Sequence, residues 1–311
     1  MKRILVTGAT GRIGRHVVPL LIERGYRVRV MLRRPPPPES WVNEAEVIQV
    51  SLTGRETLHT AVADMDAVIH LAGIMPPAPD DEVFETNIEG TYRILQALAE
   101  RQNKPRLLFA SSDATYCTGW SLSAYSASIR EDAAQHPTVF YGLSKVIGER
   151  MCKYFEEMHK IPIVRLRFVW TLEAAEILDL FLKAPYRDYL ADADRGAWDE
   201  QGIVAVPLEE DGCPFSEHIC DVRDAAEAVV LALESEAAPG QAFNIAGPEP
   251  FRYTEVGPEL AQKIGTRAVE ARCRGIHSYE LSIEKARAML GYRPRFKILE
   301  SLADALANAK A

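Results

Sequence analysis

A glycine-rich turn near the amino terminus limits the fold of this chain more than any other feature. An apolar strand pattern runs directly into TGATGRIG, residues 7–14, and a helical pattern follows at once. Gly8, Gly11 and Gly14 have the spacing GxxGxxG, and glycine permits both a tight turn and the close approach of backbone N–H groups to a pyrophosphate. Such turns also occur for structural reasons alone, so the surrounding pattern decides what this one means.

That pattern is a regular alternation of strands and helices. Apolar runs predict strands at 4–6, 28–32, 47–50, 67–71, 107–110 and 163–168, and helical periodicity predicts helices near 12–24, 55–63, 82–102 and 139–159. Nearly unbroken apolar strands between helices are typical of a parallel sheet covered on both faces, so we predict an α/β, Rossmann-type doubly wound fold. In this context the turn predicts a dinucleotide site. The cofactor-binding residues expected there are Gly8, Gly11, Arg12, Ile13 and Gly14.

The pattern weakens after residue 170, and a chain of 311 residues is long for one compact core. We therefore predict a dinucleotide-binding domain at 1–170 and a smaller α+β substrate lobe at 171–311. Segments near 218–247 could return to the first domain, which would leave the two lobes partly interleaved.

Composition and charge exclude several classes of partner. A net charge of −8 without a basic stripe argues against nucleic acid, whose binding depends on clustered Lys and Arg. No apolar run is long enough to cross a bilayer, and the first residues lead straight into a strand rather than a signal peptide. The five cysteines are scattered without a CxxC pair, which argues against disulfides and a metal site. We expect a cytoplasmic protein whose partner is a small molecule.

The residues after the second strand bear on the choice of cofactor. In NAD-binding folds an acid about 20 residues past the glycines holds the adenine ribose hydroxyls. Here that place is Leu32, followed by Arg33 and Arg34. An arginine would pair with the 2′-phosphate of NADP, although two arginines also commonly solvate a loop. Because the acid is absent as well, we predict NADP as the preferred cofactor, bound through Arg33, with NAD as the alternative.

Tyr141 and Lys145 form a YxxxK pair at the start of a predicted helix, where the spacing places both side chains on one face. The pair alone is common, and a core tyrosine beside a solvated lysine would explain it equally well. A nearby ammonium can lower the pKa of a tyrosine from its ordinary value of about 10 by about 1–3 pH units. Tyr141 would then exchange a proton with a substrate oxygen, and Lys145 would also reach the nicotinamide ribose.

Ser112 is the residue that favours the catalytic interpretation. It ends the predicted strand RLLFASS, and open α/β sheets bind ligands at the carboxyl ends of their strands. Its hydroxyl would hydrogen-bond the reacting oxygen opposite Tyr141, with Ser111 as the nearest rival. Asn87 either supports a backbone kink or an ordered water near the pair, or is simply a polar residue on a helix.

Together the motifs resemble the extended short-chain dehydrogenase/reductase family, and within it the NAD-dependent epimerase/dehydratase group. They are TGATGRIG, HLAG (70–73), NIEGT (87–91), FASSDATY (109–116), YGLSK (141–145), HICDVRDAAEAVVLAL (218–233), FNIAGPEP (243–250) and SIEKARAMLGYRPR (282–295). The resemblance implies that Ala72 and Gly73 line the cofactor cleft and that Ser112, Tyr141 and Lys145 are catalytic.

The resemblance also implies a homodimer through the helices at 82–102 and 139–159. Both helices carry apolar residues beyond one core-facing stripe, including Ile88, Leu95, Val146, Ile147 and Met151. The other explanation for these residues is that the second lobe covers them.

Several positions depart from the patterns of the group. Sugar dehydratases have an Asp-Glu pair after the catalytic hydroxyl, and here Asp113 is followed by Ala114. The turn after the sixth strand reads FVWTLEAAE instead of an NxYGP-like sequence, and Ser216-Glu217 stands where an arginine commonly clamps a diphosphate. The adenine-side acid after the third strand is Ser51. Without cationic phosphate ligands, a nucleotide-diphosphate sugar is less favoured as the substrate.

The leading hypothesis is an NAD(P)-dependent oxidoreductase that transfers hydride between a nicotinamide cofactor and a small hydroxyl or carbonyl compound, with sugars and sugar acids as candidates. A nucleotide-sugar 4-epimerase is the alternative, because it needs the same three residues. A protein that senses NAD(P) without turnover is a more distant alternative, since this chain keeps both Tyr141 and Lys145.

Overall fold

The computed structural model, which describes residues 2–35, 39, 41–116 and 128–308, is built around a parallel sheet in the order β11-β6-β5-β4-β1-β2-β3. Its strands are β1 (Arg3–Thr7), β2 (Arg27–Leu32), β3 (Glu46–Gln49), β4 (Ala67–His70), β5 (Arg106–Ser112), β6 (Ile163–Phe168) and β11 (Ala242–Ile245). Every pair of neighbours in the sheet is parallel. The predicted α/β doubly wound class is therefore confirmed.

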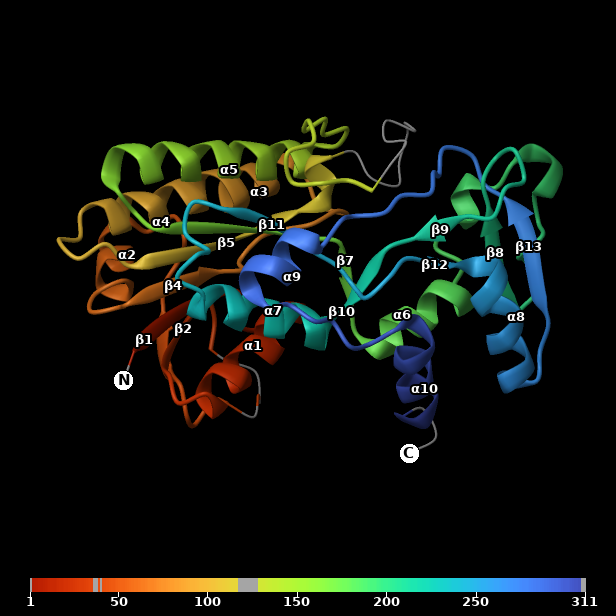
Figure 1. Cartoon of the computed structure of the whole chain (residues 1–311), viewed down its shortest axis with the longest axis horizontal. Helices are drawn as coiled ribbons and strands as arrows, with labels where there is room; N and C mark the ends of the chain where they lie inside the picture. Colours follow the sequence, from red (N-terminus) through yellow and green to blue (C-terminus); the bar gives the residue numbers. More distant parts are fainter. Residues whose placement is uncertain (1, 36–38, 40, 117–127, 309–311) are drawn as a thin grey trace.

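Helices cover both faces of this sheet (Figure 1). One face carries α1 (Arg12–Glu23), α7 (Val222–Glu234) and α9 (Glu284–Leu290). The other carries α2 (Arg55–Ala61), α3 (Asp80–Val83), the π-helical turn η1 (Phe84–Glu89), α4 (Gly90–Ala99) and α5 (Phe140–His159). Each face has its own apolar core, because strands buried on both sides send alternate side chains to opposite faces.

The helix predicted at 82–102 is interrupted. It consists of α3, η1 and α4 and ends at Ala99. The π-helical turn inserts an extra residue into the helix, and such insertions occur frequently at functional sites. Asn87 lies in this turn.

A second lobe packs beside the sheet and holds a separate apolar core (Figure 1). Its strand pairs are β7 (Trp170–Leu172) with β10 (Ile219–Asp221), β8 (Val204–Leu208) with β13 (Ala268–Arg272), and β9 (Ser216–Glu217) with β12 (Phe251–Arg252). Its helices are α6 (Ala174–Leu182), α8 (Tyr253–Ile264) and α10 (Ile298–Asn308). Short 3₁₀ turns lie at η2 (Asp113–Thr115), η3 (Arg187–Tyr189) and η4 (Asp192–Asp194).

The chain crosses between the lobes more than once. After the first strands of the second lobe it returns through α7 and β11, and β11 adds a strand to the edge of the large sheet beside β6. It then leaves again for β12, α8 and β13. Residues that are far apart in sequence therefore meet where the lobes join.

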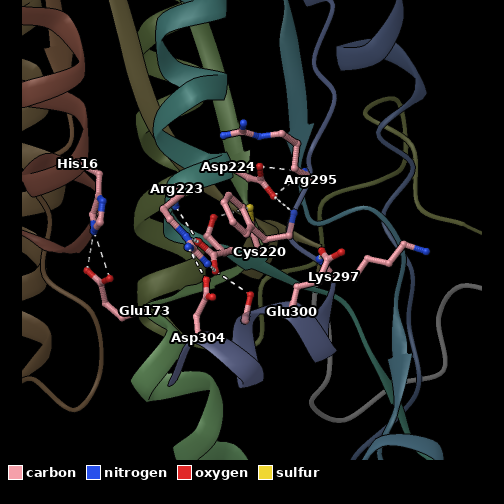
Figure 2. A network of polar contacts seen from close by, with 12 residues as sticks. His16, Glu173, Cys220, Arg223, Asp224, Arg295, Lys297, Glu300 and Asp304 are labelled. Atoms are coloured by element: carbon pink, nitrogen blue, oxygen red, sulfur yellow. Dashed lines mark hydrogen bonds and ion pairs between the residues drawn. The ribbon is translucent and has the colours of Figure 1, made fainter. Parts of the chain in front are cut away.

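Polar side-chain contacts join the two lobes on the side of α1 and α10. His16 of α1 contacts Glu173 at 2.9 Å, as Figure 2 shows. In the same region Arg223 donates to both carboxylate oxygens of Asp221 at 2.8 Å, and the hydroxyl of Ser301 on α10 donates to Asp221 at 2.7 Å. Asp221 is buried, so these donors compensate its charge and hold α10 against the start of α7.

Within the described part of the chain, no helix combines the length and the apolar character that a membrane crossing requires.

Candidate active site

A cleft of about 710 Å³ lies at the carboxyl ends of β1, β4, β5 and β6. Strand order reverses between β1 and β4, and such a switch point is where open α/β sheets bind ligands. One part of the lining comes from the glycine-rich turn and another from the loop after β4, the end of β5 and the start of α5. The remaining part belongs to the second lobe and includes Trp170, Tyr186, Tyr189, Glu217 and Tyr279.

The glycine-rich turn fits a pyrophosphate. Gly8 has φ +72°, which side chains disfavour, and a Cβ on Gly14 would collide with the carbonyl oxygen of Gly8. Helix α1 begins at Arg12, and no described side chain caps its first turn. The first N–H groups of any α-helix lack an intrahelical partner. Because no described side chain caps them here, those of α1 can receive an anion.

The other predicted cofactor residues take different positions. Arg12 and Ile13 line the cleft, and Arg12 donates to both oxygens of Glu176 at 2.6 and 2.7 Å. Gly73 also lines the cleft, whereas Ala72 lies behind it with its backbone against Gly8.

Arg33 stands apart from this lining. It follows β2 at the same sheet edge as Gly8 follows β1, but it is exposed and does not line the described cleft. Its carbonyl oxygen accepts a hydrogen bond from Gln49 at 3.3 Å.

The structure brings Ser112, Tyr141 and Lys145 together. The Lys145 ammonium lies 5.7 Å from the centre of the Tyr141 ring and donates to the carbonyl oxygen of Ala110 at 2.8 Å. Ser112, at the end of β5, interacts with the Tyr141 hydroxyl through its side chain. It also accepts from the N–H of Ala114 at 3.1 Å, which fixes its rotamer.

The predicted lowering of the pKa of Tyr141 by Lys145 is wrong. Burial raises the pKa of Tyr141 to about 12, with Asp113 adding to the rise and the hydrogen bond from Ser112 opposing it. Burial also lowers the pKa of Lys145 to about 8. The loss of solvation on burial is the largest cause, and one N–H of the Lys145 ammonium donates to the Ala110 carbonyl.

Asn87 holds the loop after β4 against α5. Its amide donates to the carbonyl oxygen of Ile74 at 3.0 Å and to the hydroxyl of Ser144 at 3.1 Å, and its oxygen accepts from the N–H of Ile74 at 2.8 Å. A Cβ on Gly73 would lie 3.1 Å from the Lys145 ammonium, so this loop passes close to Lys145. Of the alternatives for Asn87, the structure supports the backbone role.

Ser111, the rival of Ser112 in the sequence, has a different hydrogen-bond partner. Its hydroxyl donates to Glu149 at 2.5 Å, and Glu149 also accepts from Arg167 at 2.6 and 2.8 Å. The Arg167 guanidinium and these other donors hold the pKa of Glu149 below its usual value although the carboxyl is buried. Ser111 therefore belongs to a buried network with Glu149 and Arg167, and it also lines the cleft.

His70 was not singled out by the sequence, although it stands in the HLAG motif. Its Nδ1 lies 2.7 Å from the Thr7 hydroxyl and its Nε2 lies 3.1 Å from the Thr91 hydroxyl. The Thr91 hydroxyl donates to the carbonyl oxygen of Asn87 at 2.6 Å, so it accepts from Nε2 and leaves Nδ1 to accept from Thr7. Burial lowers the pKa of His70 to about 3, so the ring is a neutral link between β1, β4 and α4.

Glu217 is a second residue whose position in the cleft the sequence does not predict. The sequence pattern shows only that Glu217 stands near a position where the family commonly has an arginine. It is buried at the second-lobe end of the cleft and accepts from the hydroxyls of Tyr186 at 2.8 Å and Tyr253 at 2.7 Å. Burial raises its pKa to about 7, the two tyrosines oppose that rise, and Asp113 adds to it.

Comparisons with known proteins agree with this geometry. The model of the NAD dependent epimerase/dehydratase family matches residues 4–176. A solved structure of a short-chain dehydrogenase/reductase superfamily protein from Agrobacterium tumefaciens, with bound NAD, is 30% identical and has a TM-score of 0.86. That match covers 99% of this chain and 97% of the other.

Two curated relatives are sugar or sugar-acid dehydrogenases. L-arabinose 1-dehydrogenase (NAD(P)(+)) of Haloferax volcanii is 30% identical over 201 residues, which are 57% of this chain and 70% of the relative. Uronate dehydrogenase of Agrobacterium fabrum is 33% identical over 170 residues. That alignment covers 53% of this chain and spans 61% of the uronate dehydrogenase.

The raised pKa of Glu217 predicts a particular pH dependence of stability. The folded protein keeps a proton up to about pH 7 that the unfolded chain releases near pH 4.5, so the stability from this group is full below 4.5 and is lost as the pH rises to about 7. Glu217→Gln removes that titration. Relative to the wild type, its free energy of unfolding should rise between about pH 5 and pH 8, by up to roughly 3 kcal/mol in denaturant titrations.

The matched control is Glu270→Gln, because Glu270 is an exposed glutamate of the same lobe. Its unfolding free energy should follow that of the wild type at every pH. Parallel curves for Glu217→Gln and the wild type would contradict the assignment of a carboxyl that titrates near neutrality.

Proposed function

The chain belongs to the NAD-dependent epimerase/dehydratase family, and we propose that it transfers hydride between NAD(P) and a small hydroxyl or carbonyl compound of the sugar type. Family membership makes it an enzyme of the short-chain dehydrogenase/reductase or epimerase kind, as the sequence predicted. The observation that carries the proposal is the meeting of Ser112, Tyr141 and Lys145 in a cleft that also contains the phosphate-binding turn.

Each side chain then has a defined task. A nicotinamide dinucleotide, when bound, supplies the hydride donor or acceptor. The turn at Gly8 and the start of α1 would hold its pyrophosphate, and Lys145 would hold the nicotinamide ribose. Ser112 would donate a hydrogen bond to the substrate oxygen, while Tyr141 would exchange a proton with it.

The raised pKa of Tyr141 bears on the direction of the reaction, which is either reduction of a carbonyl or oxidation of an alcohol. A phenol with a pKa of about 12 is protonated at neutral pH and is ready to give a proton to a carbonyl oxygen. Removing a proton from an alcohol requires that the phenolate be stabilised, and the Lys145 ammonium is the described cation nearest to do so.

A nucleotide-sugar 4-epimerase is the second candidate, because the same three residues would serve it. The lining disfavours the diphosphate of such a substrate. Of the described residues that line the cleft, Arg12 and Lys145 are the basic ones, and both already donate to acceptors of the protein. The oxidoreductase therefore remains the proposal.

Substitution of Tyr141 separates a catalyst from a sensor. Tyr141→Phe keeps the ring but removes the proton, so cofactor binding should persist while turnover falls about 10²–10⁴-fold, the usual contribution of general acid–base catalysis. Lys145→Met should lower turnover and weaken cofactor binding as well. Ser112→Ala should lower turnover less than Tyr141→Phe does, because it removes one hydrogen bond.

These variants are to be compared by steady-state kinetics and cofactor titration on a screen of sugars and sugar acids. A rate in Tyr141→Phe within about twofold of the wild type would reject Tyr141 as the acid–base residue. Tight cofactor binding without turnover on any compound would favour the sensor.

For the cofactor we propose a preference for NADP, with NAD as the alternative. Support comes from Arg33, which is exposed at the sheet edge where the phosphate-binding turn lies. Since a charged hydrogen bond contributes roughly 1.5–3 kcal/mol, NADPH should bind at least about tenfold more tightly than NADH. Arg33→Ala should remove most of that preference in fluorescence titrations, and Arg27→Ala, an exposed arginine at the other end of β2, should not. Equal affinities in the wild type would overturn the preference.

We also propose a homodimer through the helices at 82–102 and 139–159. Their outer faces carry exposed apolar side chains, among them Met158, which is 63% exposed, and Tyr154, which is 56% exposed. Val146, Ile147 and Met151 line a shallow groove of about 640 Å³ between the same helices. The prediction was wrong for Leu95, which is fully buried in the core between α4 and the sheet.

Light scattering at micromolar concentration tests this assembly. The wild type should have twice the mass of the 34.6 kDa chain, and Tyr154→Asp should shift it toward the monomer by placing a charge in the apolar contact. Leu182→Asp, on α6 and similarly exposed, should leave the mass unchanged. A monomeric wild type would rule out the dimer.

Two further sequence predictions stay predictions. One is that the domain boundary lies near residue 170, with the second lobe choosing the substrate. The other is a location in the cytoplasm.

A further inference from the structure

The second-lobe end of the cleft is acidic and aromatic. Asp113 and Glu217 supply its carboxyl groups, and the aromatic side chains there are Trp170, Tyr186, Tyr189 and Tyr279. Each carboxyl group raises the pKa of a neighbour: Asp113 acts on Glu217 and on Tyr279, and Glu217 acts on Tyr186. A ligand at this end therefore meets negative potential and flat apolar surfaces.

Glu217 keeps capacity to accept hydrogen bonds. The two oxygens of a carboxylate offer about four acceptor positions, and the hydroxyls of Tyr186 and Tyr253 occupy one on each oxygen. The tyrosines also restrict the rotamer of Glu217 while it lines the cleft. A ligand with several hydroxyl donors would use the remaining positions, whereas a ligand carboxylate would meet two like charges.

Two basic residues that follow cleft-lining residues in the sequence, Arg187 and His218, are already engaged. Arg187 follows the cleft residue Tyr186, but its guanidinium donates to the carbonyl oxygen of Trp198 and approaches Asp199 at 3.8 Å. His218 follows Glu217, but its Nε2 donates to the carbonyl oxygen of Gly247 at 3.1 Å and its Nδ1 accepts from the N–H of Leu281 at 3.2 Å. Burial lowers the pKa of His218 to about 4, so it carries no charge at neutral pH.

The two basic residues in the cleft lining stand at its other parts. Arg12 belongs to the phosphate-binding turn and is paired with Glu176, and Lys145 belongs to the catalytic group. The sequence from 117 to 127, CTGWSLSAYSA, contains no Lys, Arg or His. No side chain of that stretch can therefore supply the missing positive charge.

We propose that this end of the cleft binds a neutral, polyhydroxylated ligand of the aldose type, whose hydroxyls donate to Glu217 and Asp113, and that it disfavours uronates and sugar phosphates. The proposal rests on the proposed function and narrows its substrate class. The curated relatives include both an arabinose and a uronate dehydrogenase, so similarity alone does not decide between these classes. Glu217 is then a residue that determines specificity.

Matched pairs of compounds test the proposal directly. The neutral sugars are L-arabinose, D-galactose and D-glucose, and the anionic probes are D-galacturonate, D-glucuronate and D-glucose 6-phosphate. With cofactor in excess at pH 8, kcat/KM for a neutral sugar should exceed that of its uronate at least tenfold. A preference for the uronates, or equal values, would overturn the proposal.

Binding gives a readout that does not require turnover. Neutral sugars at millimolar concentration should raise the thermal midpoint of the cofactor-loaded protein, and their uronates should not. Neutral sugars that bind but are not oxidised would support this proposal while rejecting the oxidoreductase. The proposal for this end of the cleft would be overturned if uronates raised the thermal midpoint more than neutral sugars do. It would also be overturned if none of these compounds raised the midpoint.

Variants test whether Glu217 and Asp113 cause the preference for neutral sugars over uronates. Glu217→Gln should weaken neutral-sugar binding and reduce the neutral-to-uronate ratio at least about fivefold, without changing cofactor affinity. Asp113→Asn should reduce the same ratio and serves as a second variant should the first fold poorly. The matched control, Glu270→Gln, should keep the neutral-to-uronate ratio of the wild type. An unchanged ratio in both cleft variants would show that these carboxyl groups do not select the ligand.

Discussion

The arrangement of the cleft depends on a chain of hydrogen bonds that runs from Thr7 through His70 to Thr91. It joins β1 to β4, where strand order reverses, and its last member bonds to the backbone of Asn87 in the π-helical turn. Asn87 in turn holds the loop after β4 and the first turns of α5. The phosphate-binding turn and the Tyr141–Lys145 pair therefore have their relative positions set by one buried polar network. Because unsatisfied polar groups are costly in such a place, each member constrains the others.

The cleft contains buried titratable groups from both lobes that do not favour stability, Glu217 of β9 and Lys145 of α5. Glu217 is buried with its pKa near neutrality, and Lys145 is buried with its pKa lowered to about 8. Burying such charges costs free energy that a purely structural site would avoid. The two lobes are joined elsewhere, by His16 with Glu173 (Figure 2) and by Asp221 with Arg223 and Ser301. The contacts that join the lobes are thus separate from the titratable groups of the cleft.

Much of the sheet could be predicted because its signals are local. Strand periodicity, the glycine spacing and the YxxxK spacing each depend on neighbouring residues, and the observed β6 has the predicted bounds, 163–168. The second lobe could not be predicted as well, since β9 and β12 are two-residue strands whose pairing joins distant segments. Helix α10 went unrecognised, and Leu95 was assigned to the surface because periodicity does not tell which of two apolar faces meets the sheet. The pKa of Tyr141 and the tyrosine partners of Glu217 depend on tertiary burial, which no local pattern reports.

Isotope transfer is the most direct test of the central claim that this cleft moves hydride with Tyr141 as the proton carrier. Sugars deuterated at the carbon that bears the reacting hydroxyl are to be incubated with oxidised cofactor, and the cofactor analysed by mass spectrometry. The account predicts deuterium in free reduced cofactor, in amounts equal to the product, with the rate of labelling at least about a hundredfold lower in Tyr141→Phe. Unlabelled cofactor with every sugar, or equal labelling rates in the two proteins, would contradict it.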